Sequence, residues 1–380
     1  MEQMTSQYNH TFIRHQHTEP SKALILHIFD TDFVRQGMIS NYVSLEWTED
    51  YYGRGSFLLV CVDDAENIKL LQQGRYVAQK DLDTAMVIRQ VKYDTLAHQI
   101  VVRGFTTLDI IGEQRIIYRT IKVTNVEAGM RQIISDNMRG LPYQTIAPLQ
   151  GIPDVFETQF TGDKCIEACT SLGQESHIGF KNVFDHRNGR HIFTPYKGTD
   201  YSWGNVAGNP PRVFSAEFKN LENMIIIDDM SIFKNVAYVA GAGEGEARIW
   251  VEVGTAMGLD RFELFVDARD LQPDEDDKGL IDIETGLPAP SPEYEKVLIA
   301  RGIKKLNEHI RVKTFIGEIS QAGFGIEFGL GDVISCKSDK YGVRLDSRIL
   351  QYSRVRENNI TKLVLTMGEP QITLLQAVRL

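Results

Sequence analysis

The chain has 380 residues, of which 42% are hydrophobic and 24% charged, and its formal net charge is −10 at pH 7. This length and composition predict a soluble globular protein of two to four domains, and the acidic balance argues against a duplex nucleic-acid binder or an anionic membrane as partner. Four cysteines are too few for a disulfide framework, and no apolar stretch reaches the ~18–20 residues of a membrane span or resembles a signal peptide.

The first part of the chain predicts a β-domain behind a polar arm. Residues 1–20 are expected to form a flexible or partner-docked arm, and residues 21–105 a first β-barrel or sandwich. Val43–Trp47 alternates with period two, and Ser56–Val62 is apolar enough to predict a strand buried on both faces. A hairpin of residues 86–93 and 99–103 follows a short helix at 65–72.

Residues 106–211 predict a mixed α/β insertion domain. Apolar spacing indicates helices at 108–117, 126–138 and 164–171, with Asn125 as the N-cap of the second and Gly140 just after its end. Asn188-Gly189 is a strong hairpin turn signal.

Residues 212–292 predict a β-rich domain with an acidic loop, and residues 293–380 a helix followed by a second β-barrel-like domain. The helix is expected over Tyr294–Lys313, with Ser291 as N-cap and Pro292 at the first helical position. The predicted fold class is therefore mainly β, with two β-barrel or sandwich domains and smaller α/β domains between them.

One pattern occurs twice. Residues 74–104 begin with a glycine before a strand, contain a second strand from Ile88, and close on a third strand that ends in Gly104. Residues 331–368 repeat this order, with Ile349 in the place of Ile88. Two such units in one chain suggest duplication, and predict a protein that builds symmetry rather than one that performs chemistry.

Four stretches, in this order and spacing, resemble a known family. They are Val43–Val60 with Gly55-Ser56-Phe57-Leu58-Leu59, Ile100–Gly104 followed by Arg115-Ile116, Lys234–Gly241 with Arg261–Arg269, and Leu330–Val333 with Arg348-Ile349. The chain resembles the tail hub proteins of long-tailed bacteriophages, which are related to the trimeric hubs of contractile baseplates and type VI secretion spikes.

The resemblance implies a homotrimer in the virion, at the tail tip, made in the host cytoplasm. Two β-barrels per subunit would form a pseudo-sixfold ring on the tail tube or distal tail ring, with the tape-measure protein and receptor-binding or fibre proteins as further partners. The expected roles are docking, closing or gating the channel during genome delivery, and anchoring host-attachment components. The resemblance implies no enzyme activity, no cofactor, no membrane anchor and no specific nucleic-acid binding.

Other chemical interpretations are weaker. Gly241–Gly245 lacks the spacing of a nucleotide loop, and residues 274–279 lack the ligands of a calcium loop. The possible zinc ligands have unsuitable spacing, and the carboxylate pairs Asp228/Asp229 and Glu244/Glu246 are expected to be strand-edge and turn charges. The possible zinc ligands are Cys165, Cys169, His177, His186 and His191.

Candidate contact residues follow from charge and position near strand ends or turns. Trp203 lies in a loop and is the best candidate for an exposed contact, whereas Trp47 and Trp250 are expected in core packing or subunit contacts. A carbohydrate-binding host-recognition module and a cell-wall hydrolase remain alternative functions. The candidate interface residues are Arg75, Lys80 and Arg89 in the first β-unit, and Lys340, Arg344 and Arg354 in the second.

Overall fold

The computed structural model describes residues 24–273, 280–281, 288–319, 323–358 and 360–368. The predicted arm at 1–20 and the acidic segment 274–279 lie outside them. The chain divides into two compact units, one within Met1–Met224 and Ile316–Met367 and the other within Ile225–Phe315 and Gly368–Leu380. The finer five-domain division stays a prediction.

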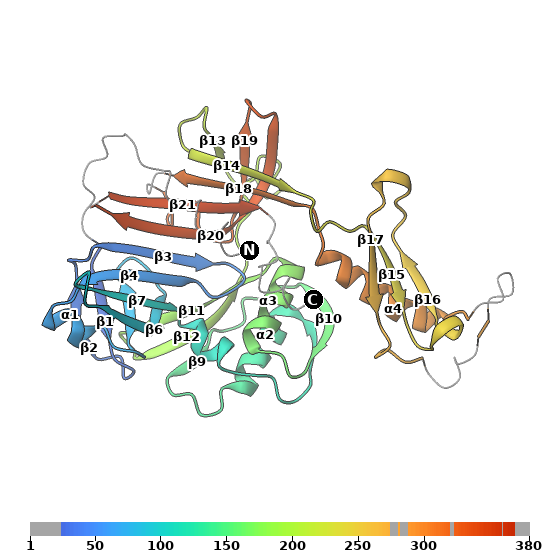
Figure 1. Cartoon of the computed structure of the whole chain (residues 1–380), viewed down its shortest axis with the longest axis horizontal. Coiled ribbons are helices and arrows are strands. Elements are labelled where there is room, and N and C mark those ends of the chain that lie inside the picture. Colours follow the sequence, from blue (N-terminus) through green and yellow to red (C-terminus); the bar gives the residue numbers. More distant parts are fainter. Residues whose placement is uncertain (1–23, 274–279, 282–287, 320–322, 359, 369–380) are drawn as a thin grey trace. The chain divides into compact units, whose positions relative to one another are not determined.

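The described chain is mainly β, which confirms the predicted fold class (Figure 1). Its strands are β1 (Leu26–Phe29), β2 (Arg35–Ile39), β3 (Ser44–Asp50), β4 (Ser56–Val62), β5 (Tyr76–Gln79), β6 (Ala85–Asp94), β7 (Gln99–Thr106), β8 (Ile121–Asn125), β9 (Gln144–Ile146), β10 (Val155–Phe160), β11 (Gly179–Asp185), β12 (Arg190–Tyr196), β13 (Val213–Ser215), β14 (Glu222–Asp229), β15 (Val236–Ala240), β16 (Trp250–Val253), β17 (Glu263–Asp267), β18 (Val312–Ile319), β19 (Val333–Ser338), β20 (Val343–Glu357) and β21 (Ile360–Gly368). The helices are α1 (Ala65–Leu70), η1 (Asp109–Glu113), α2 (Val126–Asn137), α3 (Cys165–Ser176), η2 (Gly245–Ala247), η3 (Gly258–Asp260) and α4 (Pro292–Asn307).

The largest sheet has 13 strands, with the order β14-β18-β21-β20-β3-β4-β7-β6-β5-β1-β2. Off this path, β19 pairs with β20, and β13 pairs with β19. The two regions predicted as β-barrels therefore share one sheet, and their closure into separate barrels stays a prediction. Trp47 is fully buried in the core beneath this sheet, as predicted.

The expectation that Ser56–Val62 is buried on both faces was wrong. Phe57, Leu59 and Cys61 are buried, whereas Leu58 and Val60 are only half-buried. Burial therefore alternates along β4, because the hydrophobic core covers one face of this strand more fully than the other. The apolar residues on both faces did not show this alternation in the sequence.

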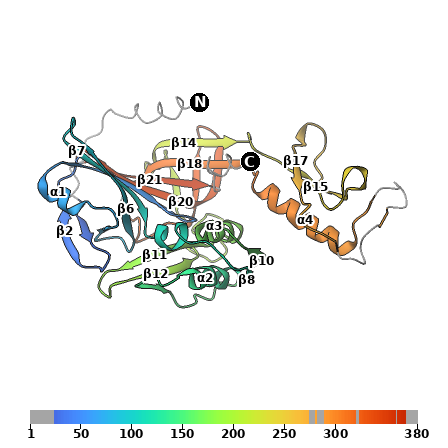
Figure 2. The same cartoon turned by 60° about the horizontal axis from the view of Figure 1, so that its bottom comes forward.

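The α/β part of the first unit contains α2 and α3 beside the β8–β10 pair (Figure 2). The Asn125 side chain accepts a hydrogen bond from the Ala128 N–H (2.9 Å), which confirms this N-cap. Gly140 has the positive φ of +72° expected just after a helix. The third helix runs to Ser176, beyond the predicted end at 171.

The helix predicted at 108–117 was wrong beyond its first turn. Only Asp109–Glu113 is helical, in a π-helical turn. Downstream, the Ile117 N–H donates to the Asp163 carbonyl (2.9 Å) and the Cys165 N–H to the Arg115 carbonyl (2.9 Å). These tertiary bonds use backbone groups that a longer helix would pair internally.

The second unit contains a small sheet of order β16-β15-β17, covered on one face by α4. Ser291 caps α4 by accepting from the Tyr294 N–H (3.2 Å), as predicted. The helix ends at Asn307 rather than Lys313, because the β-prone segment from Val312 enters β18. None of the helices in the described ranges is both long and apolar enough to cross a membrane.

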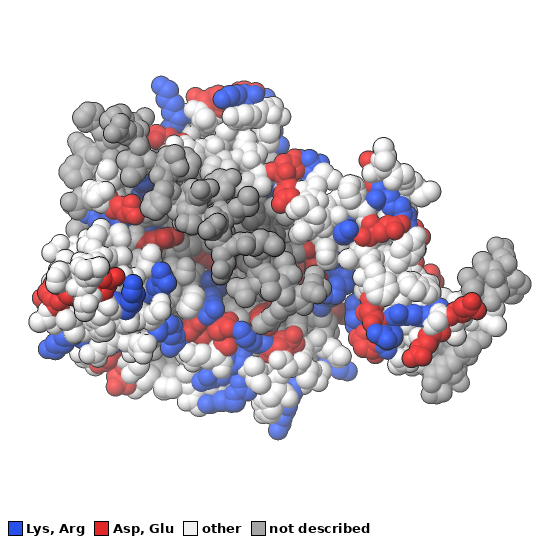
Figure 3. Space-filling view, viewed as in Figure 1, with Lys and Arg blue, Asp and Glu red and all other residues white. Residues whose placement is uncertain are grey.

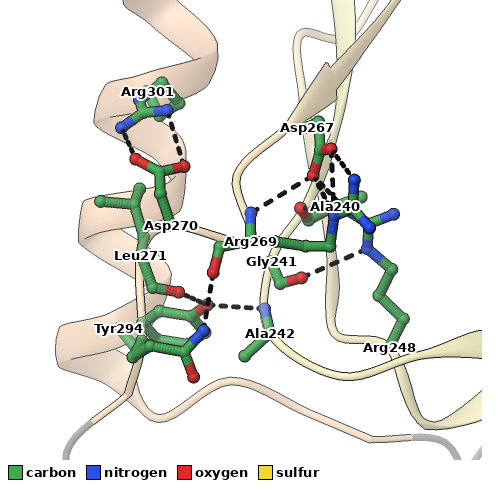
Figure 4. A network of polar contacts seen from close by, with 11 residues as sticks. Ala240, Gly241, Ala242, Arg248, Asp267, Arg269, Asp270, Leu271, Tyr294 and Arg301 are labelled. Atoms are coloured by element: carbon green, nitrogen blue, oxygen red, sulfur yellow. Dashed lines mark hydrogen bonds and ion pairs between the residues drawn. The ribbon is translucent and has the colours of Figure 1, made fainter.

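Tyr294 fixes α4 to this sheet (Figure 4). Its hydroxyl donates to the Leu271 carbonyl (2.6 Å) and accepts from the Ala242 N–H (2.8 Å). Two turns further along the same helix face, the guanidinium of Arg301 donates two hydrogen bonds to the Asp270 carboxylate. The Tyr294 hydroxyl thus supplies hydrogen-bond partners to two loop backbone groups that α4 covers from water.

Candidate functional site

The two repeated segments fold alike. Residues of β5, β6 and β7 form three neighbouring strands in chain order, and so do β19, β20 and β21. In each copy a glycine with positive φ comes just before the first strand: Gly74 has φ +85° and Gly331 has φ +92°. A residue with a Cβ is strained in this region, which explains why both copies use glycine.

The same pair of hydrogen bonds closes both copies. The Gly74 N–H donates to the Ile88 carbonyl (2.8 Å), and the Ile88 N–H donates to the Arg75 carbonyl (2.9 Å). In the second copy the Gly331 N–H donates to the Ile349 carbonyl (2.8 Å), and the Ile349 N–H donates to the Asp332 carbonyl (2.8 Å). The structure therefore confirms that the two segments share one local design. That both face the same partner ring stays a prediction.

The repeat is larger than the sequence indicated. The strand order β3-β4-β7-β6-β5 in the first copy matches β14-β18-β21-β20-β19 in the second, strand for strand. Each copy thus contains five strands, and β3 and β14 occupy equivalent positions. The sequence pattern found the last three strands of each copy and missed the first two.

The two copies join through one long strand. The first half of β20 pairs with β19, and its second half pairs with β3 in an antiparallel ladder from Gln351↔Asp50 to Glu357↔Ser44. The hydroxyls of Ser353 and Thr48 lie 2.8 Å apart across this ladder. At this junction, a strand of the second copy thus pairs directly with a strand of the first copy.

The predicted residue Arg354 lies at this junction. Its guanidinium donates to the Asp81 carboxylate (2.6 Å) and to the Gln79 side chain (3.2 Å), both in the segment at the end of β5. Only 13% of its side chain is exposed. Arg354 therefore ties the second copy to the first within the chain, and a role toward another protein stays a prediction.

Arg75 and Arg89 also make internal contacts. Arg75 donates to the carbonyls of Lys69 (2.6 Å) and Leu70 (3.1 Å) at the end of α1, where carbonyl groups lack helical partners. Arg89 donates through Nε to the buried Asp109 carboxylate (2.7 Å), which Arg54 also binds. Two guanidinium groups thus compensate one buried carboxylate.

Lys80, Lys340 and Arg344 lie at or beside hairpin turns. Lys80 is exposed directly after β5, and Lys340 and Arg344 flank the equivalent turn between β19 and β20. The Arg344 side chain is 81% exposed, with Asp339 3.9 Å away. These equivalent turns would present basic groups at similar places in the two copies.

Tyr51 is a central residue that sequence reasoning missed, because Tyr51-Tyr52-Gly53 reads as a simple turn. Its ring is fully buried, and its N–H donates to the Leu350 carbonyl of β20 (2.8 Å). Its hydroxyl lies 3.1 Å from the His177 carbonyl and accepts from the Gly198 N–H (3.1 Å). Burial raises the pKa of this phenol.

Two acidic residues beside Tyr51 were missed as well. Glu49 is buried and accepts from the indole N–H of Trp47 (3.1 Å) and from the Thr84 hydroxyl. Burial raises the pKa of Glu49, and it raises that of Asp50 to about 6. Both lie at the end of β3, where the first copy meets the second.

The residues weighed as metal ligands do not gather. Within the described ranges, no group of three or more His, Cys, Asp or Glu side chains is placed to hold a metal ion. Cys165 and Cys169 are buried, and burial raises the thiol pKa of Cys165 to about 11. His191 instead lies in an aromatic cluster, 4.9 Å from the Phe33 ring centroid.

The carboxylate pair at 228–229 is held in its ionised form. The hydrogen bond from Arg311 (2.5 Å) lowers the pKa of Asp228, and hydrogen bonds from Ser231 lower that of Asp229. A general acid needs the opposite shift. The pair therefore matches the predicted strand-edge charges.

Two tryptophans are exposed. Trp203 is 74% exposed, as predicted for its loop. Trp250 is 48% exposed, so it does not lie in the core, and the other alternative expected for it, a subunit contact, stays a prediction. On β16 its alternating position turns away from α4, toward Phe265 at 5.9 Å and Arg248 at 5.6 Å.

Basic and acidic groups are interspersed on the face that Figure 3 shows. Lys and Arg side chains there lie next to Asp and Glu side chains over much of the described surface. Such a mixed surface suits specific protein contacts better than a long-range attraction to a polyanion.

The fold is shared with solved tail proteins, two of which come from prophages. A tail protein from Neisseria meningitidis MC58 matches with a TM-score of 0.58 at 9% identity, over 93% of this chain and 99% of that one. The 43 kDa tail protein of prophage MuSo2 from Shewanella oneidensis matches with a TM-score of 0.54 at 9% identity, over 93% and 100%.

A third similar structure is the prophage tail protein gp18 from Listeria monocytogenes EGD-e. Its TM-score is 0.52 at 12% identity, over 94% of this chain and 98% of that one. No curated protein sequence matches this chain. The sequence profile of the Siphovirus ReqiPepy6 Gp37-like proteins matches residues 25–369. The chain therefore belongs to the Siphovirus ReqiPepy6 Gp37-like protein family, as its resemblance to phage tail proteins indicated.

Proposed function

We propose that this chain is a structural protein of the phage tail tip, a trimeric hub that docks on the tail tube or distal tail ring. In this role it closes or gates the channel, contacts the tape-measure protein, and anchors receptor-binding or fibre proteins. It acts by assembly and conformational opening, without catalysis or a cofactor. The family membership and the fold shared with tail proteins support a place in the virion tail.

One observation carries the hub assignment, namely the five-strand order that occurs twice in the chain. Three subunits with two similar units each present six similar surfaces. A threefold protein can then meet a sixfold ring with one kind of contact repeated. The two copies differ in sequence and length, so the ring would be pseudo-sixfold.

The oligomeric state tests the proposal. The chain has a mass of 43.1 kDa, so a trimer has three times that mass in light scattering or native mass spectrometry. Imaging of tails with a labelled chain should place it at the tip. A chain that stays monomeric at every concentration, and that is absent from the tip of the particle, would contradict the proposal.

The exposed aromatic groups favour one second candidate, a carbohydrate-binding module for host recognition. Trp203 is exposed on the first unit, and Trp250 pairs with Phe265 on the second. Flat aromatic faces can stack on sugar rings. Binding of host glycans by the purified chain, lost in Trp203→Ala or Trp250→Ala, would support this candidate. Absence of binding to a panel of host cell-wall glycans would remove it.

A further inference from the structure

A polar pocket lies between α2 and the start of β8, in the α/β part of the first unit. Its volume of about 450 Å³ is within the range of small-molecule sites, about 300–1,000 Å³. The two elements, which Figure 2 shows side by side, pack closely because Gly129 of α2 has no side chain. A Cβ there would lie 2.4 Å from Cγ1 of Val123 in β8. The pocket is lined by Tyr118, Arg119, Thr120, Ile121, Gln132, Asp136 and Asn137.

The α2 side of this pocket offers hydrogen-bonding groups of several kinds. Gln132 and Asp136 are one helical turn apart, and the amide of Gln132 donates to the Asp136 carboxylate (3.2 Å). Asn137 is only 2% exposed, and its amide donates to the Ile133 carbonyl (2.8 Å), which fixes its side chain at the pocket. Amide and carboxylate groups thus converge on one small volume, as a ligand with several hydroxyl groups requires.

Two guanidinium groups lie at the other side, beside one aromatic ring. The guanidinium carbons of Arg119 and Arg139 are 5.2 Å and 5.6 Å from the centroid of the Tyr118 ring, which holds both cations close together. Arg139 also donates to the Ile116 carbonyl (3.0 Å) and contacts the Asn137 side chain (3.5 Å).

The positive charge of these two arginines is not neutralised by an acidic side chain. Among the described residues, no carboxylate forms an ion pair with Arg119 or Arg139, although the chain as a whole has a net charge of −10. Guanidinium groups bind phosphate and carboxylate oxygens with strong, charge-assisted hydrogen bonds. This side of the pocket therefore suits an anionic group of a ligand.

Asp136 narrows the class of that ligand. A carboxylate accepts hydrogen bonds and donates none, so it repels a bare phosphate ion or an acidic side chain and attracts hydroxyl donors. A sugar supplies hydroxyl groups, and a phosphate or carboxylate substituent on the sugar supplies the anion. One molecule of this class satisfies both sides of the pocket.

We propose that this pocket binds a sugar residue that carries an anionic group, either a phosphate or a carboxylate. The anionic group lies against Arg119 and Arg139, and the sugar hydroxyls donate to Asp136. The site uses neither Trp203 nor Trp250, and it does not depend on the proposed trimer. The chain would thus bind an acidic glycan through its α/β insertion.

Calorimetric titration of the full chain tests the ligand class. The probes are glucose 6-phosphate, glucuronic acid and uncharged glucose. We expect at least one of the two anionic sugars to bind at least about tenfold more tightly than glucose, and its affinity to fall as the salt concentration rises. The stronger of the two identifies the anionic group. No binding of either anionic sugar at millimolar concentration, or equal affinity for glucose, would overturn the proposal.

Substitution of the arginines tests the position of the site. Arg119→Gln and Arg139→Gln should each weaken the binding of the anionic sugar by at least about tenfold. Arg187→Gln is the matched control, because Arg187 is an exposed arginine in the turn between β11 and β12 and does not line the pocket. Thermal unfolding checks that all three variants are folded. Folded pocket variants that bind as tightly as the control would overturn the site.

Asp136→Ala separates a sugar site from a simple anion site. It should weaken the binding of the anionic sugar, because the hydroxyls lose their acceptor, and should not weaken that of inorganic phosphate, because a repulsive charge is removed. Stronger binding of both probes by this variant would overturn the sugar assignment. A tetraglutamate peptide that binds the unchanged protein more tightly than either anionic sugar would also overturn it, in favour of an acidic protein segment.

Discussion

The ring of Tyr51 lies directly against the backbone of Gly331, where an added Cβ would be 2.1 Å from the ring carbon Cε2. Tyr51 belongs to the first copy of the repeat region, and Gly331 is the glycine that opens the second. The phenol also contacts Gly179 in the same way, with a Cβ there also 2.1 Å from Cε2. One aromatic side chain thus joins both copies and the α/β insertion, and requires glycine on two sides.

Gly331→Ala should destabilise the protein much more than Gly74→Ala. Both residues have positive φ, so each substitution costs roughly 1–2 kcal/mol of backbone strain. At Gly331 the new methyl group also overlaps Tyr51, which adds about 1–3 kcal/mol, whereas at Gly74 it meets no described atom within 4 Å. Denaturant unfolding of the two variants measures the difference. Equal losses of unfolding free energy would contradict the overlap.

Tyr51→Phe should lower the free energy of unfolding by about 1–3 kcal/mol, because the half-buried Gly198 N–H and nearby carbonyl groups lose their partner. The ring itself stays in place, so the packing against the glycines is kept. The same change at Tyr118, which is 55% exposed, serves as the control and should leave stability within about 0.5 kcal/mol. A Tyr51→Phe variant as stable as the control would show that water replaces the hydroxyl.

His191→Phe should remove a pH dependence of stability. Burial lowers the pKa of His191 to about 4 from 6.5, so the unfolded chain takes up a proton that the folded chain does not. The contribution of neutral His191 to the free energy of unfolding is therefore complete above pH 6.5. It is lost as the pH falls toward 4, by about 1.4 kcal/mol for each pH unit.

The measurement is the unfolding free energy of both proteins between pH 7 and pH 4. The phenylalanine fits the aromatic cluster of Phe33, Tyr76 and Phe184 and does not titrate. Other groups, including Asp50, titrate in both proteins and cancel in the difference. Between pH 7 and pH 4, the unfolding free energy of the variant should rise relative to that of the wild type by on the order of 3 kcal/mol. Parallel stability curves would contradict the assignment.

Tyr294→Phe should loosen α4 on its sheet. The change leaves the Leu271 carbonyl and the Ala242 N–H without the hydroxyl that joins them, at a cost of about 1–3 kcal/mol. Hydrogen exchange of the α4 amides should become faster. Arg301→Ala is the comparison, because it removes a surface ion pair with Asp270 worth about 1 kcal/mol or less. A larger effect from Arg301→Ala would reverse this ranking.

Features that depend on residues close together in the chain, such as helix caps and tight turns, could be predicted from the sequence. Asn125 and Ser291 are helix caps because their side chains accept from N–H groups three residues ahead, and this spacing is visible in the sequence. Gly74 and Gly331 could be matched because positive φ selects glycine in both copies. The three strands predicted after each of these glycines are present in both copies.

Pairings between distant segments could not be predicted. The paired strands Ser44–Asp50 and Gln351–Glu357 are separated by about three hundred residues. The residues of neither strand indicate which distant strand it pairs with. The internal ion pair of Arg354 with Asp81 follows from such a pairing, which is why the sequence could not show it. The end of the helix predicted at 108–117 was missed because tertiary hydrogen bonds override local propensity.

The ladder between β3 and β20 also has a mechanical meaning. Its seven residue pairs form one antiparallel run, with hydrogen bonds perpendicular to the strands. A pull along the strands would load all of these bonds together, whereas a pull across them would open them one at a time. The two copies of the repeat are thus joined in the way that best resists a sliding force.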